Sequence, residues 1–270
     1  MTLPADASLR EQVAGHEWYH TLELAPGLLT PGWFDTRSLL DQLPFPTSLS
    51  GRRCLDIGTF DGFWAFEMER RGASEVVAID ILDPRLWDWP AHSAAEVVAA
   101  VGTRKGRGEG FEIAREALGS RVLRLERSIY ELSPEEDGSF DFVYLGSLLL
   151  HLSDPIRALK RVRSVCAGEL LAVDAIELGL TLSHPRRPTA TLDAVGRPWW
   201  WKPNLAALVR MIEASGFEIA APPRRCFMPP GPGQPKSKVT RRALLSRTGR
   251  EVLLRERRGD PHGVVLARAV

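Results

Sequence analysis

From Arg53 onward the chain alternates short apolar runs with amphipathic stretches, and this pattern constrains the fold more than any other feature. Such alternation is typical of βαβ units, whose strands form a parallel sheet. The apolar runs are at residues 54–57, 76–79, 122–125, 142–145, 170–173, 217–220 and 264–267. Helical periodicity is present at 63–71, 110–118, 155–166 and 204–215. The sequence therefore predicts an α/β fold with a seven-stranded, mostly parallel sheet and helices on both faces.

The residues outside this alternation suggest how the chain is divided. Residues 1–50 contain apolar and aromatic residues without strand alternation, and we expect one or two short helices there, forming a lid segment. Residues 51–270 are expected to form a single domain, since α/β domains of this length are common. Within that domain, residues 221–262 carry proline, glycine and eleven basic residues. We predict that they form a long excursion between the last two strands.

Charge and composition narrow the range of partners. The 35 Lys and Arg residues are balanced by 34 Asp and Glu residues, so no global field draws the protein to nucleic acid or an anionic membrane. We find neither a signal peptide nor a stretch of about 18 consecutive apolar residues. The three cysteines form neither a metal-binding spacing nor an even disulfide set. We expect a protein of the reducing cytoplasm without a metal, a DNA partner or a membrane partner.

The turn after the first strand predicts a nucleotide-like cofactor. Residues 54–62 read Cys-Leu-Asp-Ile-Gly-Thr-Phe-Asp-Gly, with Asp56 at the strand end and Gly58 and Gly62 in the turn into a helix. Glycines there let backbone amides approach a ligand, and the helix offers its electropositive N-terminus. A dinucleotide site needs G-x-G-x-x-G, which this turn lacks. Asp80 ends the second strand, where a ribose with two hydroxyls needs an acceptor pair.

Two longer segments carry a family resemblance. CLDIGTFDGFWAFEMERRGASEVVAID (54–80) and FDFVYLGSLLLHLSDPIRALKRV (140–162) resemble the first and fourth motifs of class I S-adenosylmethionine-dependent methyltransferases. More specifically, the chain resembles the family of the tRNA wobble-uridine carboxymethyltransferase over about residues 18–220. That resemblance rests on this turn and on Trp-Tyr-His (18–20), Pro-Gly (31–32), Leu-Leu-Leu-His (148–151) and Trp-Trp-x-Pro (200–203). It implies a Rossmann-like class I methyltransferase fold and S-adenosyl-L-methionine as cofactor.

The resemblance also implies positions around that cofactor. The residues expected at its methionine and ribose are Gly58, Thr59, Gly62 and Gly146. Those expected at its ribose and adenine are Asp80, Ile81, Ile129 and Tyr130. We add Asp56, which ends the first strand, and Tyr19, because in the resembling family the N-terminal segment folds over the cofactor mouth. This arrangement agrees with the physical rule that ligands of open α/β sheets lie beyond the carboxyl ends of the strands.

The chain also departs from the family pattern. Phe60 stands where most of these enzymes have a middle glycine, so we expect a ring to cover the cofactor there. The carboxymethylating relatives use basic and tyrosine side chains for the extra carboxylate, whereas this chain has Asp35 or its neighbours and Leu150 at about those places. The unmodified S-adenosyl-L-methionine is therefore the expected cofactor.

Few protein groups are obligatory for methyl transfer, since an aligned nucleophile and often a base suffice. His151 is a candidate base because imidazole titrates near neutrality, and its alternative role is to bond the backbone at a helix entry. Asp174 and Glu177 follow the fifth strand, either as acceptor-orienting carboxylates or as solvated loop acids. His20 is a third candidate, whose alternative role is in a packed aromatic lid with Trp18 and Tyr19.

Aromatic and basic residues point to different acceptors. Trp199, Trp200 and Trp201 cannot all face one core, so we expect an aromatic-walled substrate site that also includes Trp18, with packing at a helix entry as the alternative. The basic stretches 103–108 and 224–258 are either phosphate-binding or merely solvated. The favoured function is methylation of a small molecule, such as a natural product. A tRNA wobble-uridine methyltransferase and a non-catalytic cofactor-binding regulator are the alternatives, and a homodimer is left open.

Overall fold

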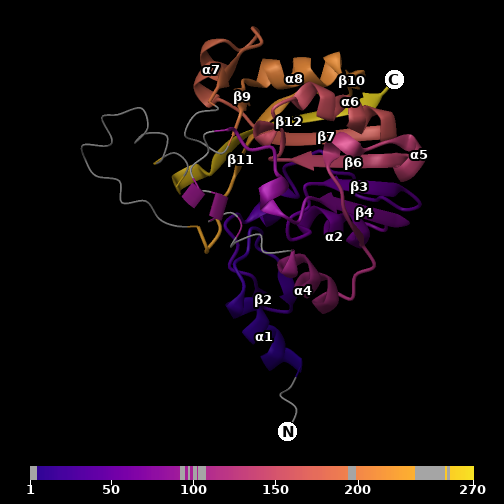
Figure 1. Cartoon of the computed structure of the whole chain (residues 1–270), viewed down its shortest axis with the longest axis vertical. Coiled ribbons are helices and arrows are strands. Elements are labelled where there is room, and N and C mark those ends of the chain that lie inside the picture. The colour runs from indigo at the N-terminus through magenta and orange to yellow at the C-terminus, as the bar shows by residue number, and fades with distance from the viewer. Residues whose placement is uncertain are drawn as a thin grey trace.

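The computed structural model describes residues 5–91, 95–96, 98–99, 102, 108–193, 199–234, 253 and 256–270. Its centre is one eight-stranded sheet with the order β10-β12-β7-β6-β3-β4-β5, to which β11 is added along β12 (Figure 1). The strands are β3 (Arg53–Ile57), β4 (Glu75–Asp80), β5 (Leu123–Glu126), β6 (Phe140–Gly146), β7 (Cys166–Ala175), β10 (Phe217–Ile219), β11 (Arg224–Met228) and β12 (Asp260–Ala269). All seven predicted strands are confirmed.

The sheet is parallel through its middle. β5, β4, β3, β6 and β7 pair in parallel, whereas β12 is antiparallel to both β7 and β10. The carboxyl ends of the five parallel strands consequently meet at one edge, and the first residues of β12 begin at that same edge. Segments distant in the sequence are brought together there, as ligand sites of open α/β sheets require.

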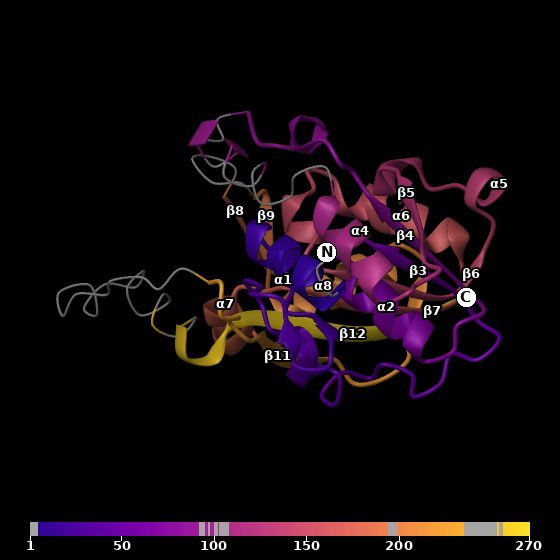
Figure 2. The same cartoon turned by 90° about the horizontal axis from the view of Figure 1, so that it is seen from below.

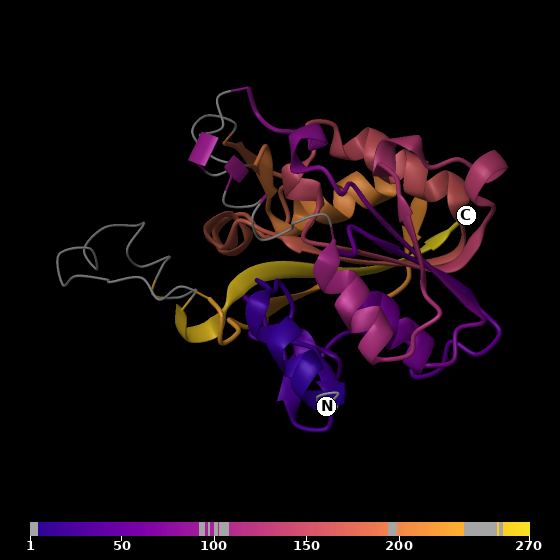
Figure 3. The ribbon, with the colours of Figure 1, turned by 60° about the horizontal axis from the view of Figure 1, so that its bottom comes forward.

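Helices cover both faces of the sheet, as predicted. One face carries α2 (Phe63–Arg70) and α4 (Glu109–Ala117), and the other carries α6 (Pro155–Val165) and α8 (Leu205–Ala214) (Figures 1 and 3). The shorter helices are α5 (Pro134–Asp137), α7 (Leu178–Ser183) and the 3₁₀ turns η1 (Thr36–Leu39), η2 (Pro84–Leu86), η3 (Ile129–Glu131) and η4 (Leu149–His151). Asp154 caps α6 by accepting from the Arg157 N–H, and Pro155 follows it.

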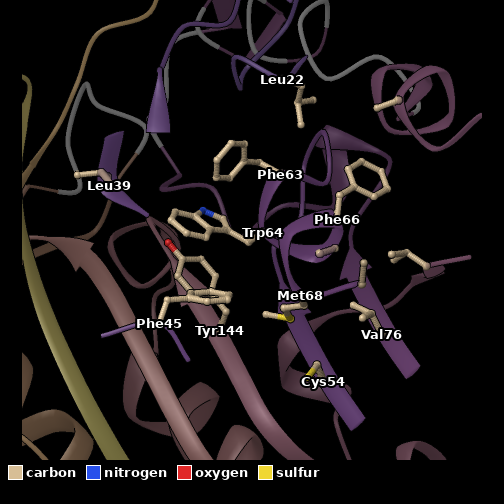
Figure 4. Packing of buried hydrophobic residues seen from close by; sticks show 14 of the residues in the cluster. Leu22, Leu39, Phe45, Cys54, Phe63, Trp64, Phe66, Met68, Val76 and Tyr144 are labelled. Atoms are coloured by element: carbon tan, nitrogen blue, oxygen red, sulfur yellow. The ribbon is translucent and has the colours of Figure 1, made fainter. Parts of the chain in front are cut away.

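Successive side chains of a strand point to opposite faces of the sheet, and this alternation of direction explains the two cores. On β4, Val76 and Ala78 belong to the cluster under α2, whereas Val77 and Ile79 belong to the cluster under α6. The first cluster is rich in aromatic rings, and Trp64 of α2 stacks on Tyr144 of β6 with centroids 4.3 Å apart (Figure 4). Both strand faces are therefore buried, which is why the strands read as continuous apolar runs.

The N-terminal segment is only partly as predicted. Helix α1 (Ala5–Gly15) and η1 confirm the expected short helices, and α1 lies beside α4 (Figure 3). A hairpin in this segment was not predicted: β1 (Glu23–Ala25) and β2 (Leu28–Leu29) pair and turn through Gly27 at φ +76°. Strands of three and two residues are too short to show alternation in the sequence.

The predicted excursion at 221–262 also contains regular structure. β11 pairs with β12 from Arg224↔Val264 to Met228↔Asp260 (Figure 2). The last strand therefore begins at Asp260, before the predicted start at residue 264. After β11 the chain returns to the N-terminal segment. There the backbone N–H of Asp35 donates to the Pro229 carbonyl, and the backbone N–H of Gly231 donates to the Trp33 carbonyl. Residues 235–252 and 254–255 lie outside the described residues, as do 103–107 of the first basic stretch. A short hairpin, β8 (Ala190–Leu192) with β9 (Trp201–Pro203), precedes α8.

Among the helices of the described residues, none has the length and apolar character needed to cross a membrane.

Candidate functional site

A cavity of about 990 Å³ opens at the carboxyl edge of the parallel strands. Loops after β3, β4, β6 and β7 line it, together with the N-terminal segment and the first residues of β12. The predicted site residues in its wall are Tyr19, His20, Asp56, Gly58, Asp80, Ile81, Ile129, Tyr130, Gly146, His151, Glu177 and Trp199. Those outside the wall are Trp18, Thr59, Gly62, Trp200 and Trp201. The fold thus brings most of the predicted residues to one space.

The glycine turn requires its two glycines. Gly58 and Gly62 have φ of +75° and +88°, in the left-handed region that side chains disfavour. A Cβ on Gly62 would lie 2.5 Å from the Phe66 ring and 2.8 Å from the Phe111 ring. Gly62 therefore serves the turn by its position between α2 and α4 and does not line the cavity. Phe60 also has a positive φ, of +50°, and its ring stacks on Tyr19 at 4.6 Å in the cavity wall.

Asp80 holds this turn while facing the cavity. One oxygen of its carboxylate accepts from the Phe60 N–H and the other from the Ile81 N–H, both at 2.8 Å. A carboxylate has about four acceptor positions, so two such bonds leave capacity for the two hydroxyls of a ribose. The same side chain can fix the loop and receive a sugar.

Asp56 supplies a second acceptor deeper in the cavity. Its side chain is 1% exposed, and Oδ2 has no hydrogen-bond partner within the described part of the chain. Burial first, and the nearby Asp80 charge as well, raises the pKa of Asp56 to about 7. The hydroxyl of Tyr144, also in the wall, is likewise buried without a partner there. Buried polar atoms without partners indicate a ligand with polar groups.

These observations fit S-adenosyl-L-methionine. Gly58 and Gly146 line the cavity, and a Cβ on Gly146 would lie 2.7 Å from the Tyr144 hydroxyl. Asp80 suits the ribose hydroxyls, and the unpartnered oxygen of Asp56 suits an ammonium group. When bound, the cofactor supplies an electrophilic methyl group on a sulfonium.

The side of the cavity near η3 is built around Asp88. Its Oδ2 accepts from the Tyr130 hydroxyl at 3.0 Å and from the backbone and hydroxyl of Ser153 at 2.7 Å each. Burial raises the pKa of Tyr130 to about 12, so its hydroxyl stays protonated and keeps donating. Ile129 and Tyr130 consequently have fixed positions beside Asp80 and Ile81, where the resemblance puts the adenine ring.

The N-terminal segment is bonded to the glycine turn by Asp61. This carboxylate is 2% exposed, and its Oδ2 accepts from the backbone N–H groups of Tyr19 and His20. Trp18 is buried in the core and donates its indole N–H to the Val13 carbonyl. Tyr19 and His20 reach the cavity, whereas Trp18 packs beneath them.

The three consecutive tryptophans point to different surroundings. Trp199 lines the cavity, bonds Asp193 Oδ2 through its indole N–H and lies under the Lys202 ammonium at 4.6 Å. Trp200 and Trp201 donate their indole N–H groups to the carbonyls of Asp88 and Ser153. The last two thus join the β9 segment to the loops after β4 and β6. Trp87 and Trp89, stacked with centroids 5.5 Å apart, complete the aromatic wall.

The candidate bases lie at separate points of the wall. His151 ends η4. Glu177 precedes α7 and donates its backbone N–H to the Pro203 carbonyl. His20 is 5% exposed, and its ring stacks on Phe63 with centroids 5.8 Å apart. Asp174 is fully buried and accepts from the backbone N–H groups of Leu148, Leu149 and Ala175. It therefore anchors the turn after β6.

A polar pair in this wall, Ser147 and His262, was not predicted. Ser147 Oγ lies 2.9 Å from His262 Nε2, although 115 positions separate the two residues. Ser147 has a φ of +52°, which is uncommon for a residue other than glycine. Asp61 was missed as well, although its place between two turn glycines was a usable signal. Within the described residues no group of three or more side chains is arranged to hold a metal ion.

Comparisons with known proteins agree with this geometry. The family model described as a methyltransferase domain matches residues 35–221. Two tRNA U34 carboxymethyltransferases, from Alcanivorax borkumensis and Dichelobacter nodosus, are 29% and 26% identical over 180 and 176 residues. Each alignment covers 64% of this chain and 47% of the relative, so the chain spans about half the length of the curated relatives it matches.

A solved structure extends the agreement in fold across the whole chain. The crystal structure of the N-terminal domain of EvdMO1, in the presence of SAH and D-fucose, aligns with a TM-score of 0.53 at 15% identity. The alignment covers 99% of this chain and 98% of that one. The chain belongs to the methyltransferase domain family and has the Rossmann-like fold of class I methyltransferases, enzymes whose cofactor is S-adenosyl-L-methionine.

Proposed function

We propose that this protein transfers a methyl group from S-adenosyl-L-methionine to a small-molecule acceptor held in the cavity. The observation that carries the proposal is the size and wall of that cavity. Its volume of about 990 Å³ lies at the top of the range of about 300–1,000 Å³ typical of small-molecule sites. Trp33, Trp87, Trp89 and Trp199 lie in the wall, so an acceptor with an apolar or aromatic body fits beside the cofactor.

The charges of the wall support a small acceptor over a polyanion. Among the described residues, the acidic side chains of the wall are Asp56, Asp80, Asp88, Glu177 and Asp260, and the Arg and Lys side chains are Arg127 and Lys202. Arg127 is ion-paired with Glu136 at 2.7 Å, and Lys202 lies over the Trp199 ring. A nucleic-acid site needs clustered cations for phosphate contacts. Among the described residues of the wall, acidic side chains instead outnumber Arg and Lys side chains.

The second candidate acceptor is tRNA, and the names of the curated relatives favour it. This chain matches only about half of the length of each relative. A part of a relative that binds RNA is therefore not implied for this chain. The basic residues at 103–107 and most of those at 224–258 lie outside the described residues and supply no contact to argue from. We retain tRNA as an outcome of the test.

The remaining residue assignments belong to this proposal. The cofactor residues are supported by the turn geometry and by the acceptors Asp56 and Asp80, and Trp199 is the substrate tryptophan with cavity contact. We also propose a cytoplasmic location, which three buried free cysteines, Cys54, Cys166 and Cys226, support.

Transfer of a radiolabelled methyl group decides between the acceptors. The protein is incubated with S-adenosyl-L-methionine labelled in its methyl group and either a low-molecular-mass cell extract or total tRNA at physiological ionic strength. We expect the label in the small-molecule fraction. Label in tRNA alone would replace the small-molecule proposal with the second candidate, and label in neither would overturn methyl transfer to both.

A further inference from the structure

Three cavity residues from distant parts of the chain form one polar series. Tyr19 lies in the N-terminal segment, Ser147 follows β6, and His262 lies in β12. The Ser147 hydroxyl lies near enough to the Tyr19 hydroxyl to influence its pKa, and Ser147 Oγ lies 2.9 Å from His262 Nε2. All three residues line the cavity. The series therefore lies in the wall of the cavity proposed to hold the acceptor.

The direction of each bond follows from donor chemistry. His262 Nδ1 lies 2.9 Å from the Asp260 carbonyl oxygen, and a carbonyl only accepts, so Nδ1 carries the proton. In the neutral ring Nε2 is then an acceptor, and the Ser147 hydroxyl donates to it. Ser147 Oγ has no second proton, so toward the Tyr19 hydroxyl it can only act as an acceptor. A proton passed along the series therefore moves toward Nε2 of His262.

The surroundings hold this series in place. His262 is 3% exposed and bonded at both ring nitrogens, so its orientation is fixed. The backbone of Ser147 is strained at φ +52°, a conformation that residues other than glycine retain mainly at functional sites. Asp174 stabilises that turn by accepting from the N–H groups of Leu148 and Leu149 at 2.8 Å each. Asp174 is thus a positioning residue for Ser147.

We propose that Tyr19, Ser147 and His262 form a proton relay that accepts the proton of the methyl acceptor, with His262 as the final base. This inference rests on the proposed function, because it concerns the same cavity and reaction. It also specifies the acceptor as a small molecule whose nucleophilic atom bears a proton at neutral pH, above all a hydroxyl.

The transfer balances in atoms and charge. As the acceptor oxygen forms its bond to the methyl carbon and the carbon–sulfur bond breaks, the acceptor proton passes to Tyr19, the Tyr19 proton to Ser147 and the Ser147 proton to His262 Nε2. The positive charge of the sulfonium is replaced by that of the imidazolium. Burial raises the pKa of Tyr19, so this phenol stays protonated and acts only as a carrier.

Titratable groups from several elements surround the relay. Burial raises the pKa of Asp174, whereas the Leu149 N–H and the charge of His262 oppose that rise, so the two side chains interact across β7 and β12. The titratable groups facing the series are Asp174 on β7, His151 on η4, Asp260 on β12 and Asp61 in the glycine turn. Three of these four are acidic.

The relay is tested first without any acceptor, by nuclear magnetic resonance of the protein labelled with ¹⁵N in histidine. We expect the neutral His262 ring to carry its proton on Nδ1, and Ser147→Ala to shift the Nε2 resonance. His184→Gln, on an exposed histidine outside the cavity wall, is the control and leaves the His262 signals unchanged. A proton on Nε2, or an Nε2 signal unaffected by Ser147→Ala, overturns the relay whether or not an acceptor is known.

Kinetics with the acceptor found by the transfer assay form the second test. His262→Gln is expected to lower kcat by about 10²-fold or more and to remove its dependence on pH, with KM unchanged. Tyr19→Phe, which keeps the ring on Phe60, should lower kcat in the same direction. Calorimetry with S-adenosylhomocysteine confirms that each variant still folds and binds. If His262→Gln has the rate and the pH profile of the wild type, the relay is refuted and the proposed function is not. If the wild type itself transfers no methyl group, the proposed function is refuted.

Discussion

Oδ2 of Asp61 lies 2.6 Å from the backbone nitrogen of Tyr19. The same oxygen lies 2.9 Å from the backbone nitrogen of His20, so one buried carboxylate joins the glycine turn to the N-terminal segment. Because Tyr19 and Phe60 stack across this junction, the segment and the turn form a common wall. The closure of the cavity on this side therefore depends on Asp61.

Substitution of Asp61 tests that dependence. Asp61→Ala leaves two buried N–H groups without their acceptor, which is expected to destabilise the fold by about 2–4 kcal/mol. Binding of S-adenosylhomocysteine should weaken as well, because Tyr19 loses its place. Thermal unfolding and calorimetry measure the two effects. Asp41→Ala, at an exposed position, should stay within about 0.5 kcal/mol of wild type. Equal stability of the two variants would refute the role of Asp61.

Asp56 makes stability depend on pH. Its pKa is raised from 3.8 to about 7 in the folded protein, so between these values the unfolded chain releases a proton that the folded protein keeps. Stability from this group therefore falls as pH rises from about 4 to 7, by up to about 4 kcal/mol. Asp56→Asn should be more stable than wild type at pH 8, with the difference disappearing near pH 4.

Thermal unfolding of wild type, Asp56→Asn and Asp41→Asn across this pH range measures that effect. The exposed Asp41 should give an offset that does not vary with pH. A pH-independent offset for Asp56→Asn would contradict a raised pKa in the folded protein.

Alanine substitutions of Gly62 and Gly27 distinguish the cost of steric crowding from the cost of backbone strain. Both have positive φ, at +88° and +76°, but a Cβ on Gly27 meets nothing within 4 Å, whereas one on Gly62 meets two phenyl rings. Gly27→Ala should cost about 1–2 kcal/mol, from the left-handed backbone alone. Gly62→Ala should cost about 1–3 kcal/mol more from overpacking. Denaturant unfolding compares them, and equal losses would show that α2 and α4 do not constrain Gly62.

Trp199 is expected to bind the acceptor, and Trp201 to stabilise the β9 segment. Trp199→Ala should raise the KM of the acceptor by about tenfold, equivalent to about 1.4 kcal/mol of lost contact, and leave the affinity for S-adenosylhomocysteine unchanged. Trp201→Ala, which removes an indole bonded to Ser153, should lower the melting temperature with a smaller change in KM. The reverse pattern would show that Trp201, and not Trp199, contacts the acceptor.

Much of the fold could be predicted because the relevant signals are local. Val76 to Asp80 is a buried strand with apolar residues on both faces, so it reads directly as a parallel strand that ends in an acid. By contrast, β11 was missed because proline and charged residues surround it, and its pairing with β12 crosses more than thirty positions. Strands of this kind are defined by their partner rather than by their own sequence.

The same distinction applies to the site. Gly58, Asp56 and Asp80 lie in one short stretch, and the distances between them follow from a single βαβ unit. Ser147 follows β6 and His262 lies in β12, and these strands are not neighbours in the sheet, since β7 lies between them. Only the antiparallel return of β12 along β7 puts His262 opposite Ala175 and beside the turn after β6. No spacing rule in the sequence carries that information.

The most direct test of the account is the affinity of the protein for S-adenosylhomocysteine, measured by calorimetry in three forms. Asp80 ends β4 at the cavity, and Glu75 begins the same strand at the opposite edge, where it pairs with Arg53. The account predicts binding to wild type, equal binding to Glu75→Gln, and affinity lowered by about 10- to 100-fold in Asp80→Asn. Absence of binding to wild type, or equal affinity in Asp80→Asn and Glu75→Gln, would contradict the cofactor site.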